Sequence, residues 1–297
     1  MFADSFKDFY FIVIPAIIML MEKTYFAIAL LFLGLCLGSF VNAAVWRLKH
    51  KKDILLDRSE CTKCHYKLGA LDLIPVFSWL ALRGKCRKCS KPISVQYPLV
   101  ELATAALFVL SLAFWPFGFE SVNNILQFAV WLLACVALVF LFVYDLKWLI
   151  LPDKAVFIIA LLGVSMAILY GIQTDSFSAF FQDVIFSLLI LSGFYLLLFI
   201  YSKGKWIGFG DVKLGVGLAL LLCNWQLAIV ALFLANLIGT LVFLPLLALK
   251  RVGRSSQIPF GPFLIIGTII AFLFGSDIIA WYNSILFSGI EVPRYQY

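Results

Sequence analysis

The chain has 297 residues, of which 64% are apolar and 13% are charged, and its formal net charge is +7. So many apolar and so few charged residues exclude an ordinary soluble globular protein and indicate a chain that crosses a membrane several times. The positive charge alone would also suit a nucleic-acid-binding protein, so the positions of the basic residues decide between the two interpretations.

Apolar stretches recur along the whole chain at about the ~20 residues that a helix needs to cross a bilayer core. They are continuously apolar rather than alternating, which predicts helices and not the strands of a barrel. We therefore expect an all-α polytopic membrane protein with about eight transmembrane helices, preceded by an interfacial or half-inserted segment at residues 9–21. The expected spans are residues 25–46, 96–115, 125–144, 155–172, 182–201, 211–223, 226–248 and 260–275.

The basic residues gather on one side of this topology. Residues 47–91 hold 12 of the 23 lysines and arginines, and the connections at 147–154, 203–213 and 250–254 hold another 8. The intervening connections hold none, so the positive-inside rule places the basic loops in the cytoplasm and both chain ends outside. The net charge then reflects topology and contact with anionic inner-membrane lipid, and we expect no nucleic-acid partner.

The first expected span ends with small and polar residues at the membrane boundary. Gly38, Ser39 and Asn42 would allow close contact and hydrogen bonds between helices. We expect them to pack this span against a neighbouring helix.

The soluble segment at residues 47–95 is too short to bury a substantial apolar core and needs another source of stability. It contains two Cys-x-x-Cys pairs separated by 21 residues, close to the spacing of tetrahedral four-cysteine zinc sites. Two disulfides are the alternative, but a cytoplasmic loop lies in a reducing compartment, which favours zinc. The predicted ligands are Cys61, Cys64, Cys86 and Cys89.

Four acidic residues lie at the cytoplasmic ends of expected spans. Glu101 opens the second span, where it is either functional or bonded between helices. Asp153 suits an N-cap of the fourth span. Asp145 ends the third span, where the helix dipole disfavours an anion, so we expect a compensating group nearby. Asp211 opens the sixth span behind two glycines that permit close backbone approach, and an N-cap is its alternative role.

Asp145 and Asp211 form the candidate catalytic pair, with Asp153 or Glu101 as substitutes. Two carboxylates at one membrane depth can share a proton, because two adjacent like charges do not readily ionise together. One carboxylate would take a proton from water while the other donates a proton to a scissile carbonyl oxygen. Such a site requires neither a metal nor a nucleophilic side chain.

Eight motifs follow one another in order from Gly38 to about Gly267. They are Gly38-Ser39-Phe40-Val41-Asn42 with Arg47, the two cysteine pairs, Leu73-Ile74-Pro75-Val76 with Ser78-Trp79, Arg83-Gly84-Lys85-Cys86, Tyr97-Pro98-Leu99-Val100-Glu101, Asp145 with Leu151-Pro152-Asp153, Gly208-Phe209-Gly210-Asp211-Val212-Lys213-Leu214, and Pro259-Phe260-Gly261-Pro262. Together they resemble the bacterial type IV prepilin peptidases, which are leader peptidases and N-methyltransferases. Lys49, Thr62 and Gln96 depart from residues usual in that family, and none of the three is a candidate catalytic position.

The resemblance implies that Asp145 and Asp211 are the catalytic aspartates and that the loop cysteines bind structural zinc. It also implies cleavage of type IV prepilins or type II secretion pseudopilins, after a glycine, at the cytoplasmic boundary of the bacterial inner membrane. S-adenosylmethionine would then donate a methyl group to the new N-terminal amine. No motif in the chain identifies the residues that would bind this methyl donor.

This interpretation divides the chain into an N-terminal segment with the first span (1–46), a cytoplasmic zinc domain (47–95) and a transmembrane aspartyl peptidase core (96–297). Two other classes of function remain open. One is an ion-coupled transporter that binds protons at intramembrane carboxylates, although acids near one membrane face rather than the midplane count against it. The other is a non-catalytic assembly scaffold that holds its partners through the zinc domain.

Overall fold

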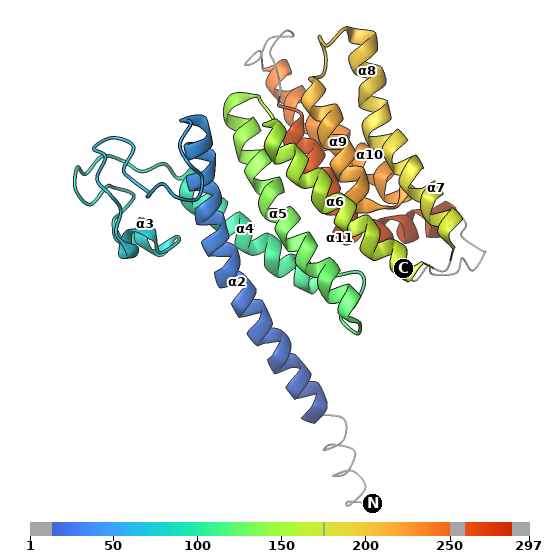
Figure 1. Cartoon of the computed structure of the whole chain (residues 1–297), viewed down its shortest axis with the longest axis horizontal. Helices are drawn as coiled ribbons and strands as arrows, with labels where there is room; N and C mark the ends of the chain where they lie inside the picture. The colour runs from blue at the N-terminus through green and yellow to red at the C-terminus, as the bar shows by residue number, and fades with distance from the viewer. Residues whose placement is uncertain (1–13, 175, 250–258, 287–297) are drawn as a thin grey trace, which may run out of the picture. The chain divides into compact units, whose positions relative to one another are not determined.

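A computed structural model describes residues 14–174, 176–249 and 259–286, and these residues form helices joined by loops (Figure 1). Within the described residues there is no β-strand, and two isolated bridges pair Glu60 with Lys67 and Lys85 with Pro92. The expected interfacial segment at 9–21 lies partly outside the described residues, and from Ile14 onward the chain is already helical. The all-α class is confirmed. The chain divides into two compact units, Met1–Ala113 and Phe114–Tyr297.

The first unit contains two long helices and the cysteine-rich segment between them. Helix α2 spans Ile14–Lys49 and α4 spans Gln96–Ala113. The connecting segment contains only short helices, η2 at Ala70–Leu73 and α3 at Phe77–Ala81.

Helices α2 and α4 lie in close contact because glycines of α2 leave room for the α4 backbone. A Cβ atom at Gly34 would lie 2.6 Å from an α4 Cα atom, and a Cβ atom at Gly38 would lie 2.7 Å from another. The Asn42 side-chain amide also donates a hydrogen bond to the Tyr97 carbonyl oxygen at 3.1 Å. The expectation that Gly38 and Asn42 pack the first span against a neighbour is confirmed.

This contact predicts that Gly34→Val lowers the free energy of unfolding of the first unit by about 1–3 kcal/mol, because the larger side chain forces the two helices apart. Ala29→Val, at an exposed position of the same helix, is the matched control and should leave the melting temperature unchanged. Thermal unfolding of the purified protein in detergent measures both effects. Equal melting temperatures for Gly34→Val and the control would contradict the close packing.

The second unit is a helical bundle in which the chain passes repeatedly from end to end (Figure 1). One of its long helices is interrupted by a π-helical turn, η3. The elements are α5 (Val122–Trp148), α6 (Asp153–Gln173), α7 (Phe177–Leu188), η3 (Leu189–Gly193), α8 (Phe194–Ser202), α9 (Phe209–Leu222), α10 (Trp225–Ala248) and α11 (Gly261–Leu286).

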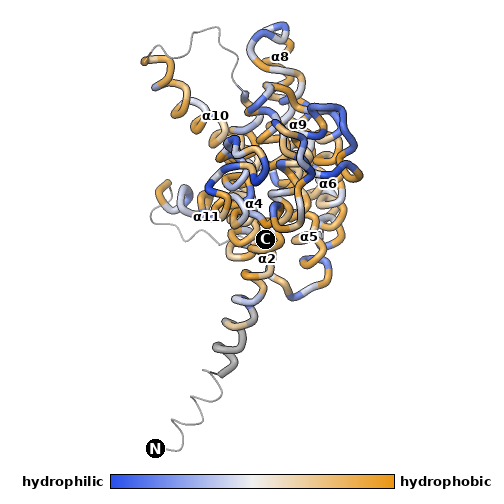
Figure 2. Tube along the Cα trace, turned by 90° about the vertical axis from the view of Figure 1, so that its left-hand side faces the viewer, coloured by the Kyte–Doolittle hydropathy of each residue, from blue (hydrophilic) through white to orange (hydrophobic). Residues whose placement is uncertain are grey.

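Seven helices of the described chain are long and apolar enough to cross a membrane. They are α2 from Lys23 onward, α4, α5, α6, the helix from α7 through α8, α10 and α11, and apolar colouring runs along them in Figure 2. The protein is therefore a multi-pass membrane protein. The expected sixth span, residues 211–223, corresponds to α9, which has 14 residues. A helix of that size is about 21 Å long, shorter than the roughly 30 Å of a bilayer core.

Helix α9 is short but closely packed on two sides. A Cβ atom at Gly217 would lie 2.6 Å from the Ile159 side chain of α6, and a Cβ atom at Gly215 would lie 2.7 Å from the Leu191 carbonyl oxygen in η3. The helix ends at Cys223, which adopts a left-handed conformation with φ 48°. Close contact on both faces fixes the position of the residues at the start of α9.

Candidate active site and metal centre

Asp145 lies three residues before the end of α5, and its side chain is buried, with 4% of the residue exposed. A carboxylate at a helix C-terminus opposes the helix dipole, so the sequence predicted a compensating group. The structure identifies it as the first turn of α11. The backbone amide of Gly261, the first residue of that helix, hydrogen bonds to the Asp145 carboxylate. The positive end of the α11 dipole therefore faces this anion.

Asp211 is the third residue of α9 and is also buried, with 8% exposed. The N-cap residue of α9 is Gly208, so the alternative role of Asp211 as the N-cap is wrong. Its carboxylate instead accepts a hydrogen bond from the Gly208 backbone, as an acid at the third position of a helix commonly does. The negative charges of Asp145 and Asp211 act on each other, so the two candidate residues belong to one site.

Leu151, in the connection between α5 and α6, lies between the backbones that hold the two aspartates. A Cβ atom at Gly210, next to Asp211, would lie 3.3 Å from the Leu151 Cβ atom. A Cβ atom at Gly261 would lie 3.4 Å from the Leu151 Cδ2 atom and 2.7 Å from the Asp145 Oδ2 atom. One leucine thus packs against the glycine beside each carboxylate, and neither glycine leaves free space for a side chain.

The Gly261 geometry predicts that Gly261→Ala lowers the rate of any reaction that uses Asp145 by about 100-fold or more, because a displacement near 1 Å is enough to misalign a reacting group. Gly239→Ala on α10 is the matched control, since its Cβ atom would make only ordinary contacts at 3.6 Å. Turnover and melting temperature are measured for both variants. Wild-type turnover in a folded Gly261→Ala protein would contradict the arrangement.

The other two acidic candidates have partners of their own. Asp153 is not the N-cap of α6, which is Pro152, so the capping expectation is wrong. Its side chain is 79% exposed and forms an ion pair with Lys213 at 2.8 Å, because the basic side chain of α9 reaches the start of α6. Glu101 lies in the first unit, where its Oε2 atom accepts a hydrogen bond from the Val76 amide at 2.7 Å.

Val76 itself occupies a strained turn. Its φ and ψ angles are 61° and −52°, and the Phe77 amide donates to the Pro75 carbonyl oxygen at 2.6 Å. This is the geometry of a γ-turn, which is rare and unfavourable for a β-branched residue. The buried Glu101 carboxylate compensates by bonding the turn, so this acid fastens the cysteine-rich segment to α4.

The four loop cysteines form one cluster, as predicted. Their Sγ atoms all lie within 4.8 Å of one another, with 3.9 Å between Cys61 and Cys89 and 4.0 Å between Cys64 and Cys86. A tetrahedral zinc ion with Zn–S bonds of ~2.3 Å would have sulfur separations of about 3.8 Å, so the cluster fits that ion. All four cysteines are free, which disagrees with the alternative of two disulfides.

The two cysteine pairs share one backbone structure, repeated from Cys61 to Cys86. In each pair the backbone amide of the first cysteine donates to the carbonyl oxygen of the residue five positions later. The carbonyl oxygen of the same cysteine accepts from the backbone amide four positions later, and all four distances are 2.9–3.0 Å. The residue after the second cysteine, His65 or Ser90, has a positive φ of 54° or 56°. Backbone hydrogen bonds from Cys89 and Lys88 lower the pKa of Cys86 to about 7, which favours the thiolate that metals bind.

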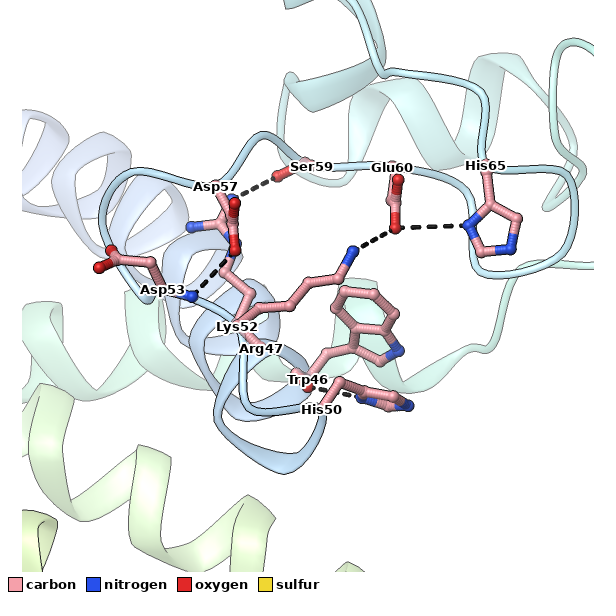
Figure 3. Close-up of polar contacts among 9 residues, drawn as sticks. All are labelled: Trp46, Arg47, His50, Lys52, Asp53, Asp57, Ser59, Glu60 and His65. Atoms are coloured by element: carbon pink, nitrogen blue, oxygen red, sulfur yellow. Dashed lines mark hydrogen bonds and ion pairs between the residues drawn. The ribbon is translucent and has the colours of Figure 1, made fainter.

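The end of α2 is fastened to the loop that precedes the first cysteine pair (Figure 3). The buried Arg47 guanidinium donates to the Ile54 carbonyl oxygen at 2.6 Å and to the Ser59 hydroxyl at 3.1 Å. Lys52 pairs with Glu60 at 2.5 Å, and this hydrogen bond lowers the pKa of Glu60. The cysteine cluster is therefore anchored to both α2 and α4 within the first unit.

Comparison with known families gives two adjacent matches. Residues 32–115 match the bacterial peptidase A24 N-terminal domain, and residues 132–244 match the type IV leader peptidase family. A prepilin leader peptidase/N-methyltransferase of Aeromonas hydrophila is 32% identical over 285 residues, which cover 87% of this chain and 93% of that protein. The chain belongs to the type IV leader peptidase family.

Further relatives in the type IV leader peptidase family carry the same name. The protein of Pseudomonas aeruginosa is 31% identical over 291 residues, covering 90% of this chain and 96% of its own length. That of Myxococcus xanthus is 34% identical over 237 residues, covering 78% of this chain and 67% of its own. No solved structure matches the chain significantly.

The sequence predicted Asp145 and Asp211 as the candidate pair, but it did not predict the backbone groups that bond to their carboxylates. The motif Pro259-Phe260-Gly261-Pro262 places two prolines and a glycine beside a membrane entry, and it was the available signal for the Gly261 contact. Leu151 belongs to the motif Leu151-Pro152-Asp153, but nothing in the sequence indicated that it packs against the glycine beside each carboxylate.

Proposed function

We propose that this protein cleaves the basic leader from type IV prepilins or type II secretion pseudopilins with Asp145 and Asp211 as its catalytic pair, and then N-methylates the new N-terminus. The observation that supports this assignment is the pair of buried, interacting carboxylates held by the starts of α9 and α11. Membership of the leader peptidase family and the names of its relatives support the substrate class.

In the proposed cleavage the two aspartates share one proton. The ionised carboxylate removes a proton from a water molecule, whose oxygen attacks the carbonyl carbon of the scissile peptide bond. The protonated partner donates its proton to the carbonyl oxygen. The tetrahedral intermediate then collapses, the C–N bond breaks, and the leaving amine takes up a proton from the pair. Gly208 and Gly261 hold the two carboxylates in place through their backbone amides.

The exposed amine produced by cleavage is the acceptor for the second reaction. S-adenosylmethionine would supply the methyl group when bound. We propose that the first unit contributes to this step. It contains the cysteine cluster and the buried Glu101 carboxylate, which accepts a hydrogen bond from the strained Val76 turn. Zinc bound by Cys61, Cys64, Cys86 and Cys89 would have a structural role there.

The distribution of basic residues supports a cytoplasmic position for both the cysteine cluster and the aspartates in the bacterial inner membrane. A prepilin carries its basic leader in the cytoplasm and its apolar helix in the bilayer. The scissile bond would then lie at the depth of the aspartates, so enzyme and substrate meet without moving the substrate helix out of the membrane.

The experiment combines the purified protein, a membrane-embedded prepilin and isotope-labelled S-adenosylmethionine, and mass spectrometry reports both reactions. Cleavage at the leader boundary with one labelled methyl group on the new terminus would support the two-step enzyme. Intact prepilin, together with proton-coupled uptake in proteoliposomes, would support the transporter instead. Intact prepilin with no uptake would support the non-catalytic assembly scaffold.

A further inference from the structure

The short helices η2 and α3 of the cysteine-rich segment carry several exposed apolar side chains. Between positions 71 and 80, five large apolar residues are 42–70% exposed, and the two helices pack on each other. A single exposed apolar side chain is common, but a group of this density marks a surface that contacts a partner or a membrane. This apolar surface consists of Leu71, Leu73, Ile74, Phe77 and Leu80.

The orientation of α3 is fixed by Trp79, which lies on another side of the helix. The Trp79 Nε1 atom donates a hydrogen bond to the Ile93 carbonyl oxygen at 3.2 Å. The Trp79 ring also packs on Gly84, where a Cβ atom would lie 2.9 Å from it. Phe77 and Leu80 are three positions apart, so they share one face of α3, and this packing leaves them 61% and 57% exposed.

Helix α3 is tied at two points to the start of α4, which is long and apolar enough to cross a membrane. The 18 residues of α4 are about 27 Å long, less than the roughly 30 Å of a bilayer core, so its first turns must lie within the membrane. Glu101, in the second of these turns, accepts the 2.7 Å hydrogen bond from Val76, the residue before α3. Ile93, which bonds to Trp79, lies three residues before α4. These bonds hold α3 at the membrane boundary.

The charge of the segment suits the surface of a bilayer that contains anionic lipid. Residues 47–95 hold 12 lysines and arginines against four acidic residues, which gives a formal net charge of +8. Arg83 and Lys85 follow α3 directly and are exposed. Basic side chains close to a membrane attract anionic headgroups. Apolar side chains flanked by basic ones are typical of a segment that lies in the interface of a bilayer.

We propose that η2 and α3 dock on the membrane that α4 crosses, with the apolar surface inserted among the lipids and Arg83 and Lys85 at anionic headgroups. The contact is intramolecular in effect, because α3 is bonded to a helix that stays in the bilayer, so even a weak interaction with lipid is sufficient. Docking holds the cysteine cluster against the membrane instead of extending it into solvent. The proposal does not depend on the peptidase function.

The test places a fluorescent amino acid at Phe77 or, in a second protein, at Leu80, in the full chain reconstituted into bilayers. Lipids brominated at different depths of the acyl chain quench a fluorophore that they contact. We expect loss of fluorescence at both positions, strongest for bromine about 5–10 Å below the headgroups. Thr62, an exposed polar position between Cys61 and Cys64, is the control and should show no loss. Melting temperatures equal to that of the wild type show that the labelled proteins are folded.

Water-soluble iodide, applied to the same proteins, identifies the other possible surroundings of the apolar surface. Quenching at positions 77 and 80 by iodide instead of brominated lipid would show that the surface faces solvent. Quenching by neither would show that another part of the protein covers it. Either result overturns the proposal.

The role of the basic residues is tested with the Arg83→Gln, Lys85→Gln variant in bilayers that contain phosphatidylglycerol. Lipid quenching at position 77 should be weaker than in the parent protein, and added salt should weaken the parent signal, because it screens the attraction to headgroups. Equally strong quenching in the variant would overturn the assignment of these two residues to the headgroups.

Discussion

Asp145→Asn and Asp211→Asn are each expected to lower prepilin cleavage by at least about 1,000-fold. Asparagine keeps the size of the side chain but can neither accept the proton of the attacking water nor donate one to the carbonyl oxygen, and such proton transfers contribute roughly 10²- to 10⁴-fold each. Both residues are buried, and each carboxylate is held by a glycine backbone. The measurement is the single-turnover cleavage rate of a membrane-embedded prepilin.

Because the two aspartates act as one unit, the double variant should be no slower than either single variant. Methylation of a synthetic substrate with an already free N-terminus should continue in all three, which shows that the protein remains folded. Asp153→Asn is the matched control, since that aspartate is exposed and pairs with Lys213. Cleavage above a tenth of the wild-type rate in Asp145→Asn or Asp211→Asn would remove that residue from the catalytic pair.

Loss of the metal is the second large effect that we expect. Zinc in small four-ligand sites contributes about 10 kcal/mol or more of apparent binding free energy, and the segment at residues 47–95 contains only short helices besides the cysteine cluster. Replacing Cys86 and Cys89 by serine should therefore abolish metal binding and unfold this segment. Methylation should be lost, while a measurable part of prepilin cleavage persists.

Metal analysis of the purified protein should give about one zinc per chain for the wild type and none for the Cys86→Ser, Cys89→Ser variant. Cys135→Ser is the control, because Cys135 is buried in α5, away from the cluster in sequence, and should leave the metal content unchanged. Limited proteolysis would locate the unfolded segment. Wild-type protein with no metal and with oxidised cysteine pairs would contradict both the zinc site and its cytoplasmic placement.

The sequence predicted the spans well because an apolar run must satisfy its own backbone hydrogen bonds in lipid, which leaves little choice of structure. It predicted the cysteine cluster because both Cys-x-x-Cys pairs lie in one short soluble segment, and their spacing is that of four-cysteine zinc sites. The contact of Gly261 with Asp145 joins residues over 100 positions apart, and no local pattern encodes such a contact. The same holds for the packing of Gly215 in α9 against Leu191, because hydropathy does not reveal the π-helical turn that contains Leu191.

The short length of α9 has a consequence for the supply of water. Its 14 residues are about 9 Å shorter than the bilayer core, so we expect the polar backbone at Gly208 and the charged connection before it to lie within the thickness of the membrane. A hydrolytic enzyme in a membrane needs a route for its second substrate. Because α9 packs between α6 and η3, we expect this polar connection to give bulk solvent a route to Asp211 within the protein rather than through lipid.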